Sequence, residues 1–112
     1  MNNLKKNGEF QIIYNSGRKS FGYYSLIFVK RNDDNLKRCG FVVSKKTGNA
    51  VCRNRLKRLF REYYRQKEEY IKDGYDIIFV AKKTAGEKYK ELKFEDIRKD
   101  LYKVLNNAKI FK

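Results

Sequence analysis

The sequence predicts an α+β fold: a single-domain sandwich over residues 1–112, in which helices pack on a small sheet. Two runs rich in aromatic and β-branched residues, 21–30 and 38–44, have the composition of strands. A third run, 75–82, is almost continuously apolar, as expected for a central strand. Segments with apolar residues at helical spacing surround these runs. The predicted order is therefore αββαβα, in a chain long enough for one core.

The first predicted helix spans residues 7–17, with Asn7 as a suitable N-cap. Phe10, Ile13 and Tyr14 stand at i, i+3 and i+4 and share one face of this helix. That face is expected to pack against the sheet.

The strand over 21–30 is expected to place Tyr24, Leu26 and Phe28 on one side. A short polar turn leads to the strand over 38–44, and this short connection predicts an antiparallel hairpin.

The central feature is a long helix that follows Gly48, is capped by Asn49 and runs to about Lys72. Its apolar residues fall within a sector of roughly 100° and should be buried. They are Cys52, Leu56, Leu59, Phe60, Tyr63 and Tyr70. The remaining surface carries a dense row of polar and positive side chains, named here the basic ridge. The basic ridge consists of Arg53, Asn54, Arg55, Lys57, Arg58, Arg61 and Arg65. Like charges four residues apart repel, so the ridge indicates an anionic partner and not a stabilising device.

After the central strand, residues 84–90 are expected to form a loop. A last helix should begin near Lys93, with Phe94, Ile97, Leu101 and further apolar residues at helical spacing.

The charge balance favours a nucleic acid as that partner. The chain has 28 Lys and Arg against 13 Asp and Glu, a net charge of +15. Binding to phosphates releases counterions, and a folded, aromatic-rich chain suits nucleic acid better than a membrane surface. No apolar run approaches the ~20 residues of a membrane span, and the N-terminus lacks a signal-peptide core. A cytoplasmic location is therefore expected.

Protein-based catalysis finds little support in the residue types present. There is no His, which removes the usual triads and zinc sites. Cys39 and Cys52 are too few for a disulfide framework and should be reduced core residues. Neighbouring carboxylates point in different directions and form no acid/base site. The residues alone thus predict a nucleic-acid-binding module without chemistry of its own.

Two smaller features have alternative interpretations. The start of the long helix beside Lys45 and Lys46 suits a phosphate, although every helix start shares that property. Phe10, Tyr14 and Phe28 could be ordinary core residues or could stack on unpaired bases.

Residues 44–61 contain the string Ser44-Lys45-Lys46-x-Gly48-Asn49-Ala50-Val51-x-Arg53-Asn54-Arg55-x-Lys57-Arg58-x-x-Arg61. This stretch resembles the protein subunit of bacterial ribonuclease P. It is similar to the signature of that family, including an Arg-Asn-Arg core. The N-terminal Leu4-Lys5-Lys6, followed by Phe10-Gln11 and Tyr14, is similar to the family's opening helix. The similarity covers nearly the whole chain.

The resemblance implies a protein cofactor that helps a catalytic RNA to remove the 5′ leader from precursor tRNA by endonucleolytic cleavage. The implied partners are that RNA subunit and precursor tRNA, with no obligate protein partner and no membrane. Mg²⁺ is expected at the RNA active site and not at a site made by protein alone. The family fold also implies a left-handed crossover around the basic helix, against the usual right-handed preference.

The resemblance further implies two groups of binding residues. Leader-binding residues would be Phe10, Tyr14, Phe28, Lys45 and Lys46. The basic ridge would face the RNA subunit, or the leader near the cleavage site. A structural RNA-binding protein of the ribosomal kind is the alternative, and a protein-only nuclease is disfavoured because no carboxylate cluster for two-metal chemistry is visible.

Overall fold

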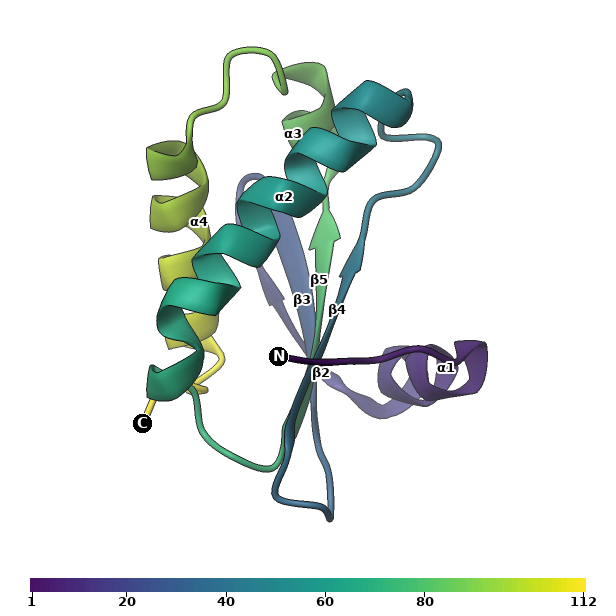
Figure 1. Cartoon of the computed structure of the whole chain (residues 1–112), viewed down its shortest axis with the longest axis vertical. Coiled ribbons are helices and arrows are strands. Elements are labelled where there is room, and N and C mark those ends of the chain that lie inside the picture. Colours follow the sequence, from purple (N-terminus) through teal and green to yellow (C-terminus); the bar gives the residue numbers. More distant parts are fainter.

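The computed structural model describes residues 1–112 and shows five strands with helices on both faces of one sheet (Figure 1). The strands are β1 (Asn2–Asn3), β2 (Arg18–Phe21), β3 (Ser25–Arg31), β4 (Lys37–Val42) and β5 (Tyr75–Ala81). The helices are α1 (Asn7–Ser16), α2 (Ala50–Lys67), the 3₁₀ turn η1 (Glu68–Tyr70), α3 (Lys83–Glu87) and α4 (Phe94–Asn107). The predicted α+β class is confirmed. None of these helices combines the length and the apolar character that a membrane span requires.

The strand order in the sheet is β1-β4-β5-β3-β2. β5 is central, as predicted, and pairs antiparallel with β3 and parallel with β4. The predicted hairpin between β3 and β4 is therefore wrong. Arg31 at the end of β3 and Lys37 at the start of β4 both pair with Tyr75, so β5 lies between the two strands.

The β3–β4 connection passes over the start of β5 and is fastened to it. The backbone N–H of Asn32 donates to the Gly74 carbonyl at 2.8 Å, and the N–H of Gly74 donates to the Leu36 carbonyl at 3.1 Å. Gly74 has φ +82°, a conformation that side chains with a Cβ rarely adopt. Gly74 was predicted only to end a helix. Its left-handed conformation also forms the turn that leads into β5, between β3 and β4.

The two faces of the sheet are covered unequally. Figure 1 shows α2, α3 and α4 on one side and α1 alone on the other. The larger core cluster lies under α2 and α4 and includes Ile27, Ile77 and Phe79, whereas the smaller one lies under α1. The parallel connection from β4 through α2 to β5 is left-handed, as the resemblance implied (Figure 1).

Helix α2 buries the predicted face, with one exception. The apolar residues from Cys52 to Tyr63 lie in or against the core, and the Asn49 side chain accepts a hydrogen bond from the Cys52 N–H at 2.9 Å. Tyr70 was predicted on this face but is 54% exposed, because the α-helix ends at Lys67 and the 3₁₀ turn redirects the chain. Tyr64 is fully buried and was not predicted.

Four local predictions are corrected. The N-cap of α1 is Lys6 and not Asn7. The predicted strand 21–30 covers the last residue of β2, a tight turn at residues 22–24 and most of β3. That turn moves Tyr24 to the α4 side of the sheet, away from Phe28. The predicted loop 84–90 overlaps α3, and β1 was not predicted.

Candidate nucleic-acid interface

Helix α1 covers one part of its face of the sheet and leaves another part open. The covered row contains Phe28, Ile78 and Gly40, which are neighbours across β3, β5 and β4. The Phe10 ring lies on Gly40, where a Cβ atom would stand only 2.6 Å from the ring. Tyr14 meets Phe28 edge to face with ring centroids 4.9 Å apart.

The next row of the same face is open. It runs across β2, β3, β5 and β4 through Phe21, Leu26, Val80 and Val42. Phe21 is 61% exposed and the other three are half-buried, so these residues form an apolar floor without a cover. We name this floor the open apolar row.

Aromatic rings border the open apolar row along the side occupied by α1. Phe10 and Tyr14 are half-buried and pack against the same small cluster as Leu26 and Val42. Phe28 is only 8% exposed, so it supports the rings above it and offers little surface of its own. Of the three aromatics predicted to bind the leader, the structure therefore leaves two accessible.

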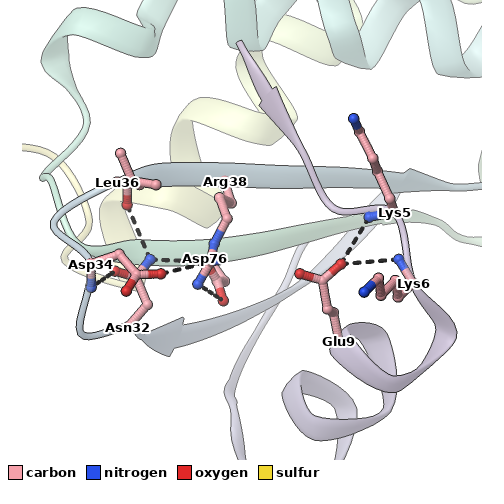
Figure 2. A network of polar contacts seen from close by, with 8 residues as sticks. All are labelled: Lys5, Lys6, Glu9, Asn32, Asp34, Leu36, Arg38 and Asp76. Atoms are coloured by element: carbon pink, nitrogen blue, oxygen red, sulfur yellow. Dashed lines mark hydrogen bonds and ion pairs between the residues drawn. The ribbon is translucent and has the colours of Figure 1, made fainter.

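Figure 2 shows two sets of polar contacts, one at the start of α1 and the other around the β3–β4 connection. The Glu9 carboxylate accepts hydrogen bonds from the backbone N–H groups of Lys6 at 3.0 Å and Lys5 at 3.1 Å, which lowers the pKa of Glu9. Beside it, Arg38 donates to the Asp76 carboxylate at 2.8 Å. The Glu9 contacts cap the start of the helix that carries Phe10 and Tyr14, and the Arg38–Asp76 pair joins β4 to β5.

The basic ridge of α2 divides into three sides. Lys57 and Arg61 face β4 and α1, because together with Phe10 and Phe41 they line a hollow of about 230 Å³. The Arg61 guanidinium lies 5.6 Å from the centroid of the Phe41 ring. Arg53 lies on the same side of the helix and donates to the Gly48 carbonyl at 2.8 Å.

A second set of ridge residues points directly to solvent. Asn54, Arg58 and Arg65 are exposed. Arg65 makes a surface ion pair with Glu62 at 3.3 Å, whereas Asn54 and Arg58 have no intramolecular polar partner. Their donors are available to an external ligand.

Arg55 lies on the third side, toward α4. Its Nε donates to the Tyr89 carbonyl at 3.0 Å, and its second nitrogen donates to the Leu92 carbonyl. Three-residue spacing from Cys52 turned this side chain toward the protein. Arg55 therefore anchors the α3–α4 connection, and its side chain lies apart from the exposed part of the basic ridge.

Lys45 and Lys46 are exposed in the connection between β4 and α2. This connection continues from Val42, so the two lysines place positive charge at one end of the open apolar row. At the opposite end of the sheet, carboxylates gather around the β3–β4 connection, including Asp34 and Asp76 (Figure 2). No three His, Cys, Asp or Glu side chains come together in a way that could hold a metal ion.

The prediction from sequence missed the floor of this surface. Phe21, Val42 and Val80 fell within the predicted strands 21–30, 38–44 and 75–82, but none of them was predicted to line a binding surface. The alternation in β5 contained a signal, since Ile78 and Val80 share a face, but coverage by α1 could not be deduced from it.

Comparison with known proteins gives one consistent family. The family model for Ribonuclease P matches residues 1–109. The ribonuclease P protein component of Fusobacterium nucleatum subsp. nucleatum is 60% identical over 110 residues, which cover 98% of this chain and 99% of the relative. That of Clostridioides difficile is 37% identical over 96% of this chain and 91% of its own length.

Solved structures agree with these relatives. The RNase P protein of Staphylococcus aureus superimposes with a TM-score of 0.89 at 34% identity, covering 100% of this chain and 99% of that one. The RNase P protein of Thermotoga maritima gives a TM-score of 0.87 at 29% identity, covering 96% and 97%.

Proposed function

The chain belongs to the ribonuclease P protein family, and from this premise we propose that it holds the single-stranded 5′ leader of precursor tRNA against the catalytic RNA. It is the protein cofactor of ribonuclease P, a tRNA-processing endoribonuclease, and its partner is the RNA subunit. The relatives named above are components of that enzyme, so a ribosomal role is set aside.

The open apolar row beside the rings of Phe10 and Tyr14 is the observation that carries the proposal. Unpaired bases stack on exposed aromatic and apolar surfaces regardless of sequence, whereas a paired helix hides its base faces. A floor such as this one would bind a single-stranded leader without strong sequence preference. Phe21 supplies a third accessible ring at the β2 edge.

Cations on two sides of the row would pair with the leader phosphates. Lys45 and Lys46 lie beyond the Val42 end, and Lys57 and Arg61 reach the side of Phe10 through the small hollow. Positive charge next to stacking surfaces is the usual arrangement for single strands.

Asn54, Arg58 and Arg65 would contact the RNA subunit, because they point away from the row and toward solvent. The two sets of residues occupy different sides of one rigid helix. Helix α2 can therefore bind substrate on one side and the catalytic RNA on the other. Arg55 would act indirectly, through the connection that it anchors.

The chemistry of cleavage is assigned to the RNA subunit, and the Mg²⁺ ions that it requires would be held there. The side chains of this chain would bind, orient and neutralise charge, which fits a surface of lysines, arginines and aromatics. The proposal also places the protein in the cytoplasm, with the RNA that it serves.

The test of the leader site uses the holoenzyme reconstituted with a bacterial ribonuclease P RNA. Affinities are measured for precursor tRNA with a long leader and with a single-nucleotide leader. Phe21→Ala and Phe10→Ala should each reduce the benefit of the long leader by about 1–3 kcal/mol, the value of one base stack. Tyr23→Ala is the matched control, because Tyr23 is 59% exposed but pairs with Tyr24 on the other side of the turn. Equal losses for both substrates would refute the leader site.

The test of the ridge uses the salt dependence of holoenzyme assembly. Arg58→Ala combined with Arg65→Ala should lower the slope of log K against log salt by about one for each phosphate that the protein no longer binds. Arg55→Ala should leave that slope unchanged and lower the melting temperature instead. An unchanged slope in the double variant would remove this side of α2 from the RNA interface.

A further inference from the structure

A second aromatic surface lies on the face of the sheet opposite α1, at the C-terminal ends of α2 and α4. It is where α2, α4 and the C-terminal residues meet (Figure 1). Here a hollow of about 360 Å³ is lined by Lys67, Tyr70, Tyr102, Asn106, Phe111 and Lys112. We name it the aromatic hollow. Tyr70 is 54% exposed and Tyr102 is 51% exposed, so large parts of both rings face solvent.

The walls of the aromatic hollow are held firmly. Segments 70–72 and 110–112 pair as a short antiparallel ladder, with two backbone hydrogen bonds of 2.9 Å. Ile71 and Ile110 lie beneath this ladder, exposed by only 1% and 0%. The rings above them are therefore presented on a fixed backbone, which reduces the entropy lost when a ligand binds.

The lining has the chemistry of a site for a single nucleotide. The Tyr102 and Phe111 ring centroids lie 5.7 Å apart and form one wall, and the Lys67 Nζ lies 5.6 Å from the centroid of the Tyr70 ring. The Asn106 amide can both donate to and accept from a base edge. Two lysines and no Asp or Glu side chain line the hollow, so its side chains are complementary to an RNA phosphate.

We propose that the aromatic hollow binds an unpaired nucleotide of the ribonuclease P RNA subunit. The base stacks on Tyr70 or Tyr102, and its phosphates pair with Lys67 and Lys112. The RNA subunit is the occupant because the sheet separates the hollow from the open apolar row proposed for the leader. The inference rests on the proposed function: on the partnership with the RNA subunit and, for the choice of occupant, on the position proposed for the leader.

The experiment measures binding of the full-length chain to a bacterial ribonuclease P RNA at several salt concentrations. Tyr70→Ala combined with Tyr102→Ala should weaken binding about 5- to 150-fold, the effect of losing one base stack. The salt slope should remain the same, because stacking involves no counterion. Tyr70→Phe combined with Tyr102→Phe is the matched control, which keeps both rings and should bind as the wild type does. Lys67→Ala should instead reduce the slope by about one.

Each outcome has a distinct meaning. If wild type binds RNA and the alanine pair binds equally well, the inference is overturned while the proposed function stands. If wild type itself neither binds nor stimulates the RNA, the proposed function fails. In the reconstituted holoenzyme, a loss of affinity confined to precursor tRNA with a long leader would make the leader the occupant and refute the inference. A change in sedimentation with unaltered RNA binding would identify a second copy of the chain, again against it. Circular dichroism and thermal melting check that the alanine pair is folded. If it is not, the salt slope of Lys67→Ala decides, and an unchanged slope would overturn the inference.

Discussion

Gly40→Ala tests whether the Phe10 ring is seated on the sheet as described. The added Cβ would stand 2.6 Å from Phe10 Cε1 and 2.8 Å from Cζ, closer than any real contact, so the ring must move outward. Overpacking of this kind costs about 1–3 kcal/mol. Replacing a strand glycine by alanine recovers roughly 0.5–1 kcal/mol of chain entropy. The net expectation is a decrease of about 0.5–2 kcal/mol in the free energy of unfolding.

A double-mutant cycle isolates the contact. In a Phe10→Ala background the clash disappears, so Gly40→Ala should become stabilising by about 0.5–1 kcal/mol. Urea unfolding of the four proteins measures both steps. The change of sign is the decisive result, and it corresponds to a coupling of about 1–3 kcal/mol between the two positions. An equal decrease in both backgrounds would refute the placement of the ring.

The same substitution has a functional expectation. Because Phe10 borders the open apolar row, its displacement should lower the affinity of the holoenzyme for long-leader substrate. Assembly with the RNA subunit should not change, since Gly40 is buried beneath α1. A defect in assembly with unchanged leader affinity would contradict the division of surfaces proposed above.

Three further predictions concern buried and capping groups. Asp100→Asn should cost about 2–4 kcal/mol in urea unfolding, because the carboxylate accepts from the N–H groups of Tyr23 and Tyr24 and from the Ser25 hydroxyl; a cost like that of a surface substitution would disprove this. Burial raises the pKa of the Cys39 thiol to about 12 and also raises that of Cys52, so neither should react with an aromatic disulfide reagent at neutral pH until the chain unfolds, and rapid reaction would show that they are accessible. Because its pKa is lowered, the ionised Glu9 carboxylate stabilises the fold at pH values above 4.5, the ordinary pKa of the group. This stabilisation is lost as the pH falls through the lowered pKa. Thermal melts of Glu9→Gln should therefore show lower stability near neutral pH and a weaker acid dependence, and parallel curves for the two proteins would refute the role of Glu9.

Periodicity in the sequence was enough to predict the helices that cover the larger core. The apolar positions of α2 and α4 repeat at helical spacing over several turns, and Ile97, Leu101 and Val104 are all fully buried. Capping by Asn49 could be predicted because it depends on a local contact with Cys52. Helical periodicity and capping depend on residues close together in the sequence, so the folded protein retains the pattern that the sequence predicts.

Pairing between strands could not be predicted in the same way. The five residues between β3 and β4 are typical of a hairpin, yet Arg31 and Lys37 both pair with Tyr75. No local feature of these residues indicates that a strand more than thirty residues later in the chain will lie between β3 and β4. Tyr70 shows a related failure, since the helical pattern continues through it although the helix has ended.

Residue type predicted the chemistry of the surface better than the role of each side chain. The excess of arginine on α2 identified an anionic partner, and the resemblance identified which one. However, the packing side of Arg55 depends on carbonyls in the α3–α4 connection, which the sequence of α2 does not contain. The accessible floor depends likewise on how far α1 extends over the sheet.

The central position of β5 affects the order in which the protein can form. Its partners β3 and β4 are made earlier during synthesis, but they do not pair with each other and must keep a gap for it. Until residue 81 leaves the ribosome, α2 has no complete sheet on which to pack, and the open apolar row lacks Val80. Contacts between such distant segments are slow to close. We therefore expect the nascent chain to carry the positive charge of α2 before the open apolar row is complete. The open apolar row and the packed basic ridge should then form together, late and cooperatively.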